Sequence, residues 1–299
     1  MVGSSILKIF KQKGYKKIYV QERRYLDLLD QKKTQSYINK IKPDYVIIAA
    51  ARVGGILANK NFKAEFIYEN ITIQSNLIHA SYKADVKKLI FLGSSCIYPK
   101  FAKQPIDENE LLNGKLEETN DAYAVAKIAG IKMCESYNKQ YKTNYICLMP
   151  TNLYGPNDNY DIKTGHFYPA FIKKLYIAKK KREKFITIWG NGSAKRELMF
   201  VDDLADACEF FLRKKTKHFL INIGSGQEKT ILGFCNFLMK KIGIKLKIKF
   251  IKKKLNGTPR KILNTNLAKK YGWKPKFDLH KGFDLTYKHF LKFSIKEKI

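Results

Sequence analysis

Residues 89–99 read LIFLGSSCIYP, a short apolar run that ends at Gly93 and is followed at once by small polar residues. An apolar run of this length, bounded by turn and polar residues, predicts a buried strand over 89–92. Similar runs occur at 17–20, 45–49 and 145–149, and stretches with helical periodicity separate them. Strands that alternate with helices predict an α/β fold, in which helices cover both faces of a parallel sheet.

The carboxyl ends of parallel strands meet at one rim of the sheet, where such folds place their ligands. Residues 50–56, 93–98 and 150–155 each follow a predicted strand, so we expect them to lie together at that rim. After Pro156 the pattern loosens. We therefore expect one unit over residues 1–156 and a smaller α/β unit over 157–299, with the chain able to cross back between them.

The bulk properties narrow the class of protein. The 299 residues are 45% apolar, and the formal charge is +32. The lysines are spread along the whole chain and follow no known nucleic-acid-binding pattern, which favours a solvated basic surface over a nucleic-acid partner. The five cysteines are odd in number and lack metal-site spacing, so we expect no metal and a reducing cytoplasm. The longest apolar run is too short to span a membrane, and no signal peptide is evident.

Tyr123 and Lys127 carry the clearest chemical signal. They are four residues apart on a predicted helix over 122–141 and therefore share a face. An ammonium group beside a phenol stabilises the phenolate and lowers a pKa that is otherwise about 10. Ser94, at the end of the strand over 89–92, can hydrogen-bond a substrate carbonyl in the same crevice. A tyrosine four residues before a lysine is common in a chain rich in both residues, so the pair alone does not indicate a catalytic site. The indication comes from its context, in which a strand, a serine and then this helix follow one another.

Finer motifs accompany this order of strand, serine and helix. They are AAARVGGI at 49–56, SSCIYPK at 94–100, PTNLYGP at 150–156, RE at 196–197 before VDD at 201–203, and GTPRK at 257–261. The order resembles the extended short-chain dehydrogenase/reductase superfamily, and the motifs resemble its GDP-L-fucose synthase family, from Met1 to the final helix. The resemblance implies a Rossmann-like fold and an NADPH-dependent enzyme that converts GDP-4-keto-6-deoxy-D-mannose to GDP-L-fucose. In that family the sugar is epimerised at C3 and C5, and its C4 ketone is then reduced.

The resemblance also assigns site residues. Ser94, Tyr123 and Lys127 would act in hydride transfer, and Cys96 would remove a carbon-bound proton while His166 delivers one. Arg23 would favour NADPH through the 2′-phosphate, and Asn256 stands where the family usually has an aspartate. The expected cofactor contacts are Gly3, Arg23, Leu92, Gly93, Ser94, Ser95, Lys127, Pro150, Thr151, Asn152, Leu153 and His166, and the expected GDP-sugar contacts are Lys174, Trp189, Arg196 and Lys261.

Two other interpretations stay open at this point. Another extended short-chain nucleotide-sugar epimerase or dehydratase would keep Tyr123 and Lys127 but would not need Cys96 and His166 as a pair. An inactive truncated relative, or a basic nucleic-acid binder, would show no turnover. The resemblance further implies a homodimer packed through the helices near 62–83 and 122–141.

The start of the chain departs from the superfamily pattern. The superfamily opens with a strand and a glycine-rich turn that binds pyrophosphate, and here only Gly3 matches that turn. From this departure we expect a start upstream of Met1 and weak NADPH binding by the sequence as written. We also expect a gap in the sheet between the runs at 17–20 and 89–92.

Overall fold

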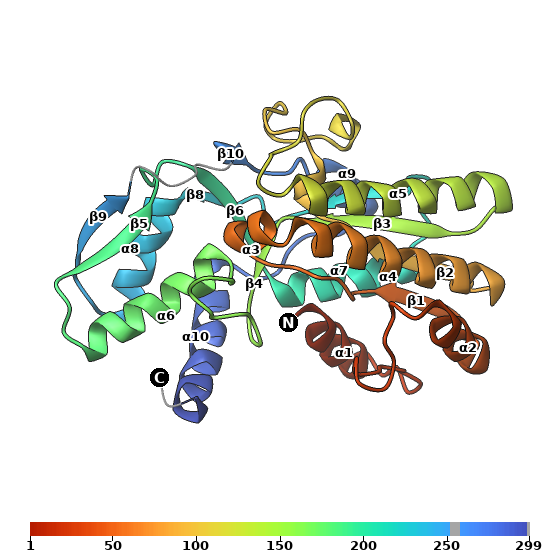
Figure 1. Ribbon diagram of the computed structural model, residues 1–299, viewed down its shortest axis with the longest axis horizontal. Coiled ribbons are helices and arrows are strands. Elements are labelled where there is room, and N and C mark those ends of the chain that lie inside the picture. Colours follow the sequence, from red (N-terminus) through yellow and green to blue (C-terminus); the bar gives the residue numbers. More distant parts are fainter. Residues whose placement is uncertain (252–257, 298–299) are drawn as a thin grey trace.

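The computed structural model describes residues 1–251 and 258–297 and confirms the α/β fold with a parallel sheet (Figure 1). Its larger sheet has the order β1-β2-β3-β7, and all three pairings are parallel. These strands are β1 (Tyr45–Ile48), β2 (Lys88–Leu92), β3 (Tyr145–Pro150) and β7 (Leu220–Ile223).

Helices cover both faces of this sheet, which explains why its strands are apolar at nearly every position. Leu89 and Phe91 pack in the core beneath α2 (Gln31–Ile41), α4 (Lys63–Lys83) and α5 (Asp121–Tyr141). Ile90 and Leu92 point the other way, into a core shared with α1 (Val2–Gln12) and α7 (Val201–Arg213). The alternation is the period-2 geometry of a strand. Two short helices complete this half, α3 (Ile56–Asn61) and α9 (Asn266–Tyr271).

The second half of the chain builds a separate core, on the left in Figure 1. There β6 (Lys195–Phe200) pairs in parallel with β4 (Asn152–Tyr154) and β10 (Arg260–Lys261), and antiparallel with β8 (Glu228–Thr230). A further parallel pair joins β5 (Phe185–Trp189) to β9 (Lys247–Ile251). The helices that pack here are α6 (Phe167–Lys180), α8 (Ile231–Ile242) and α10 (Leu279–Lys296).

The structure corrects two expectations about the edge of the large sheet. Residues 17–20 form no strand, and Tyr19 and Val20 are 58% and 63% exposed. Leu89–Leu92 has neighbours on both sides, because β2 pairs with β1 and with β3. Among the described residues, the edges without a pairing partner are therefore those of β1 and β7, and no gap lies beside β2. Apolar composition alone could not show that the 17–20 run has no strand beside it.

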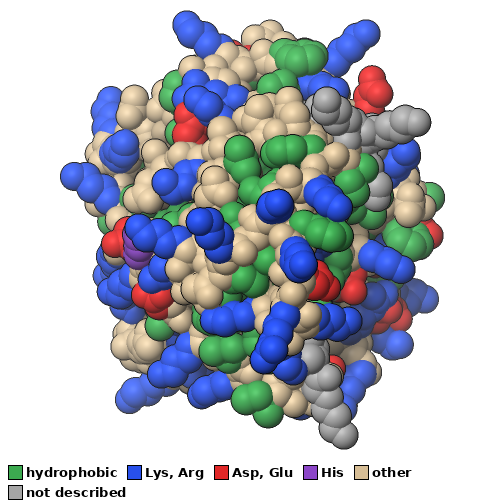
Figure 2. Space-filling model, turned by 90° about the vertical axis from the view of Figure 1, so that its left-hand side faces the viewer, with side chains coloured by type: hydrophobic (Ala, Val, Ile, Leu, Met, Phe, Trp, Pro, Cys, Tyr) green, Lys and Arg blue, Asp and Glu red, His purple; other side chains and the backbone are tan. Residues whose placement is uncertain are grey.

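The surface carries the basic charge in dispersed form. On the face in Figure 2, lysine and arginine side chains are scattered among neutral ones rather than gathered in one block. Within residues 1–251 and 258–297, no helix is long and apolar enough to cross a membrane. The same residues hold no cluster of three or more potential metal-binding side chains.

Candidate active site

A cavity of about 370 Å³ opens at the carboxyl ends of the large sheet, next to the second core. Its volume falls within the usual range for small-molecule sites. It gathers most of the residues singled out from the sequence, although these come from segments far apart in the chain. The expected residues that line it are Leu92, Gly93, Ser94, Cys96, Tyr123, Lys127, Pro150, Thr151, Asn152, Leu153, His166, Lys174, Trp189, Arg196 and Lys261.

A few expected cofactor contacts do not line this cavity. Ser95 is buried and does not reach the cavity. Gly3 does not line it either, although its neighbours Met1 and Val2 do. Arg23 is exposed and lies 3.8 Å from a carboxylate oxygen of Glu69, which also pairs with Arg52. Asn256 and Gly257 lie outside the described residues.

Ser94, Tyr123 and Lys127 meet where β2 ends against α5. The Ser94 side chain accepts a hydrogen bond from the Cys96 backbone N–H at 3.2 Å and so caps the short 3-10 helix Ser95–Ile97. Lys127 is almost fully buried, and its Nζ donates to the Leu92 carbonyl at 2.8 Å. The same ammonium lies 5.9 Å from the centre of the Tyr123 ring. The strand end thus fixes the lysine, and the helix places the tyrosine above it.

The pKa of Tyr123 shifts in the opposite direction to the sequence prediction. Burial raises it first, the nearby Cys96 raises it further, and a hydrogen bond with Ser94 opposes the change. Burial also lowers the pKa of Lys127 to about 8, because a charged group loses its hydration. Desolvation is therefore the largest influence on the pKa of both groups. Tyr123 keeps its proton near neutral pH and is suited to act as a general acid.

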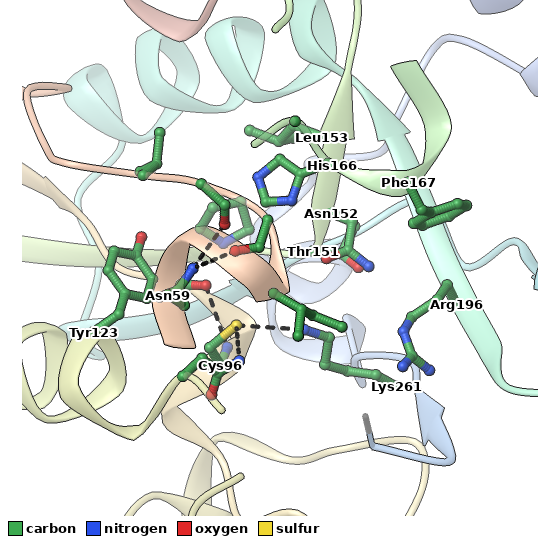
Figure 3. A pocket seen from close by; sticks show the side chains of 18 of the residues that line it. Asn59, Cys96, Tyr123, Thr151, Asn152, Leu153, His166, Phe167, Arg196 and Lys261 are labelled. Atoms are coloured by element: carbon green, nitrogen blue, oxygen red, sulfur yellow. Dashed lines mark hydrogen bonds between the residues drawn. The ribbon is translucent and has the colours of Figure 1, made fainter. Parts of the chain in front are cut away.

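Cys96 lies among polar groups of the cavity wall (Figure 3). The Asn120 amide nitrogen is 3.4 Å from its sulfur, and the Lys261 ammonium is 3.5 Å from it. The other four cysteines are buried, so Cys96 is the cysteine that reaches the site in the part of the chain described. A thiol in this setting can be reached by a ligand and is flanked by hydrogen-bond donors.

His166 approaches the same cavity from the start of α6, on a different side from Cys96 (Figure 3). The surrounding protein and then the Lys261 charge lower its pKa to about 4. Water reaches the ring through the cavity and weakens this effect, but any pKa below the usual 6.5 leaves most of the imidazole neutral at pH 7. The site thus holds a thiol and a neutral imidazole on separate walls.

The loop that carries His166 is fixed by a close backbone contact. The Gly55 N–H donates to the Thr164 carbonyl at 2.8 Å. A Cβ at Gly55 would lie 2.4 Å from the Gly165 carbonyl oxygen, and backbone there cannot move aside as a side chain can. The segment 54–56 and the loop before His166 therefore fit together only with glycine at this position.

Gly55→Ala is accordingly expected to lower the free energy of unfolding by about 1–3 kcal/mol, the usual cost of overpacking. Thermal unfolding would measure it. Gly3→Ala is the matched control, because that position is helical and open, and alanine there should be neutral or stabilising. Equal melting temperatures for Gly55→Ala and the unchanged protein would contradict this account of the loop.

The far wall of the cavity is cationic and aromatic. Arg196 and Lys261 are paired neighbours on β6 and β10, so their charges lie side by side. The Lys174 ammonium lies 5.8 Å from the centre of the Trp189 ring. A flat ring and two adjacent cations suit a ligand that combines a base with a pyrophosphate.

Sequence reasoning missed several polar residues of the site, among them Asn59, Asn120 and Glu197. Asn59 and Asn120 line the cavity, and Glu197 lies beneath it. The Glu197 carboxylate accepts from the backbone N–H groups of Gly226 and Leu263 at 2.7 and 3.0 Å. Asn120 could have been found from its place just before the Tyr123 helix, and Asn59 from its place just after Gly54 and Gly55, whose carbonyls it bonds. Glu197 depends on contacts distant in sequence.

Comparison with known proteins shows which family the chain is similar to. The model of the NAD dependent epimerase/dehydratase family matches residues 1–224. GDP-L-fucose synthase 1 of Arabidopsis thaliana is 45% identical over 98% of this chain and 90% of its own length. GDP-L-fucose synthase of Escherichia coli (strain K12) is 43% identical over 97% and 94%. A GDP-mannoheptose C4 reductase from Campylobacter jejuni, solved with NADP bound, superposes with a TM-score of 0.87 at 32% identity, over 97% and 95% of the two chains.

Proposed function

Because this chain belongs to the GDP-L-fucose synthase family, within the NAD dependent epimerase/dehydratase family, we propose that it converts GDP-4-keto-6-deoxy-D-mannose to GDP-L-fucose. The family makes it an NADPH-dependent oxidoreductase and epimerase. The observation that carries the proposal is one cavity that holds Ser94, Tyr123 and Lys127 together with Cys96 and His166. A plain 4-epimerase or dehydratase does not require that second pair.

The donor set along the sheet rim fits the cofactor. Leu92–Ser94 and Pro150–Leu153 line the cavity as two adjacent strand ends, and Lys127 reaches the first of them from α5. When bound, NADPH supplies a hydride to the C4 carbon of the keto sugar. Thr151 and Asn152 both donate to the Glu197 carbonyl at 3.3 Å, which fixes the second strand end.

Reduction of the ketone needs a proton on the C4 oxygen, and Tyr123 is placed to supply it. The raised pKa keeps its hydroxyl protonated until charge develops on that oxygen. The Ser94 hydroxyl donates to the same oxygen, and Lys127 stabilises the phenolate that remains. Tyr123 and Ser94 thus act on the C4 oxygen, and Lys127 acts on the phenolate oxygen. The tyrosine proton ends on the alcohol product.

Epimerisation uses the other two groups. Cys96 removes the proton from the carbon next to the ketone, and the electron pair of that C–H bond passes to the C4 oxygen as an enolate. His166 then returns a proton to the carbon from the other side, which inverts its configuration. A neutral imidazole is a weak acid, but an enolate carbon is basic enough to take its N–H proton. Water then returns a proton to the imidazolate and takes one from the Cys96 thiol, which resets both groups for the second carbon.

The test uses the purified protein with NADPH and GDP-4-keto-6-deoxy-D-mannose in deuterated water. We expect NADPH consumption, a fucose-configured product, and deuterium at C3 and C5. NADPH consumption without deuterium at either carbon would indicate a simple 4-reductase. Exchange without NADPH consumption would indicate an epimerase alone. Salt-sensitive retention on DNA without turnover would favour a nucleic-acid binder instead.

A further inference from the structure

Asn120 occupies the N-cap position of α5 yet does not cap the helix. Asparagine is favoured at this position because its side-chain oxygen normally accepts from a backbone N–H of the first turn. No such bond forms here, and the Asn120 side-chain oxygen is buried without a partner among the described residues. Helix α5 therefore does not account for the orientation of this amide.

The amide is instead turned toward the reactive sulfur. Its Nδ2 lies 3.4 Å from Cys96 Sγ, and Asn120 itself lines the cavity. The Lys261 ammonium, 3.5 Å away, is the other donor at this sulfur. A donor to sulfur binds weakly to a thiol and much more strongly to a thiolate, because the second hydrogen bond is charge-assisted. The amide N–H is therefore placed to donate to the sulfur when Cys96 acts as the base.

The two donors differ in what else they must do. Lys261 pairs with Arg196 on adjacent strands, and in the proposed reaction that wall binds the pyrophosphate. A phosphate oxygen competes with the sulfur for the Lys261 ammonium. Among the described residues, the Asn120 amide nitrogen has one hydrogen-bond partner, the Cys96 sulfur, and Asn120 stands at the start of the helix that carries Tyr123. It can stay on the sulfur throughout the reaction.

We propose that Asn120 is a further catalytic residue, whose side-chain N–H holds the Cys96 thiolate while it takes the proton from the sugar carbon. The inference rests on the proposed function and assigns Asn120 to the epimerisation half alone. The hydride-transfer half depends on Ser94, Tyr123 and Lys127, none of which bonds to the Asn120 amide.

Two variants separate this role from helix capping. Serine and aspartate are both good N-cap residues, but neither presents an amide N–H to the sulfur. We expect Asn120→Ser to slow deuterium exchange at the sugar carbons roughly tenfold or more, the scale of a lost hydrogen bond to a charged group. Asn120→Asp should be slower still, because it places a carboxylate against the thiolate. Oxidation of GDP-L-fucose by NADP, which reverses only the hydride step, should change little in both variants.

Asn138 provides the control on the same helix. Its side chain bonds the backbone N–H and carbonyl of Tyr145, so Asn138→Ser should lower the melting temperature and leave exchange unchanged. Exchange at the unchanged rate in both Asn120 variants would overturn the assignment. A parallel fall in exchange, oxidation and melting temperature would also overturn it, since that is the signature of a structural residue. Absence of exchange in the unsubstituted protein would instead reject the proposed function, and this inference with it.

Discussion

Tyr123→Phe is expected to slow reduction of the C4 ketone by roughly a hundredfold or more, the usual scale for a lost general acid. The ring stays in place, packed edge-on at 6.2 Å from Phe66, and only the hydroxyl is removed. Deuterium exchange at C3 and C5 should continue, because Cys96 and His166 remain. Steady-state NADPH consumption and exchange measured on the same sample would show the two halves separating.

The pH dependence provides an independent check on this pair. The Lys127 side chain must be protonated to stabilise the phenolate that forms on Tyr123, and burial lowers the pKa of Lys127 to about 8. The rate of the hydride step should therefore hold below about pH 8 and fall as the pH rises above it. Lys127→Met should remove this fall along with most of the activity. A reduction rate in Tyr123→Phe equal to that of the unchanged protein would exclude Tyr123 from the mechanism.

The strands of the sheet centre could be predicted because both of their faces are buried. Leu89–Leu92 and the run beginning at Tyr145 need apolar residues at every position, and that pattern is visible without a structure. The run at 17–20 has a similar local pattern but is exposed and unpaired. What decides between the two cases is the presence of a neighbouring strand, which a local pattern does not contain.

In the site, too, local features could be predicted and features that depend on distant contacts could not. The spacing of Tyr123 and Lys127 is a property of one helix, and sequence reasoning placed both in the cavity. The direction of the Tyr123 pKa shift was wrong, because it depends on how much protein surrounds the ring. The Lys261 contact with Cys96 joins residues 165 positions apart in the chain, and no spacing rule reaches that far.

Cys96→Ser should reduce deuterium exchange at C3 and C5 by roughly a thousandfold, which would make it the most selective substitution in the site. The serine hydroxyl can still accept from Asn120 and Lys261, so the local structure should persist. It does not ionise near neutral pH as a thiol can, so the base is lost while its neighbours remain. Oxidation of GDP-L-fucose by NADP should survive, because that step uses Ser94, Tyr123 and Lys127.

Mass spectrometry of recovered substrate would measure exchange, and absorbance at the NADPH band would follow oxidation. Exchange at the normal rate would show that another group removes the proton. Loss of both activities with an unchanged melting temperature would place Cys96 in the hydride step as well.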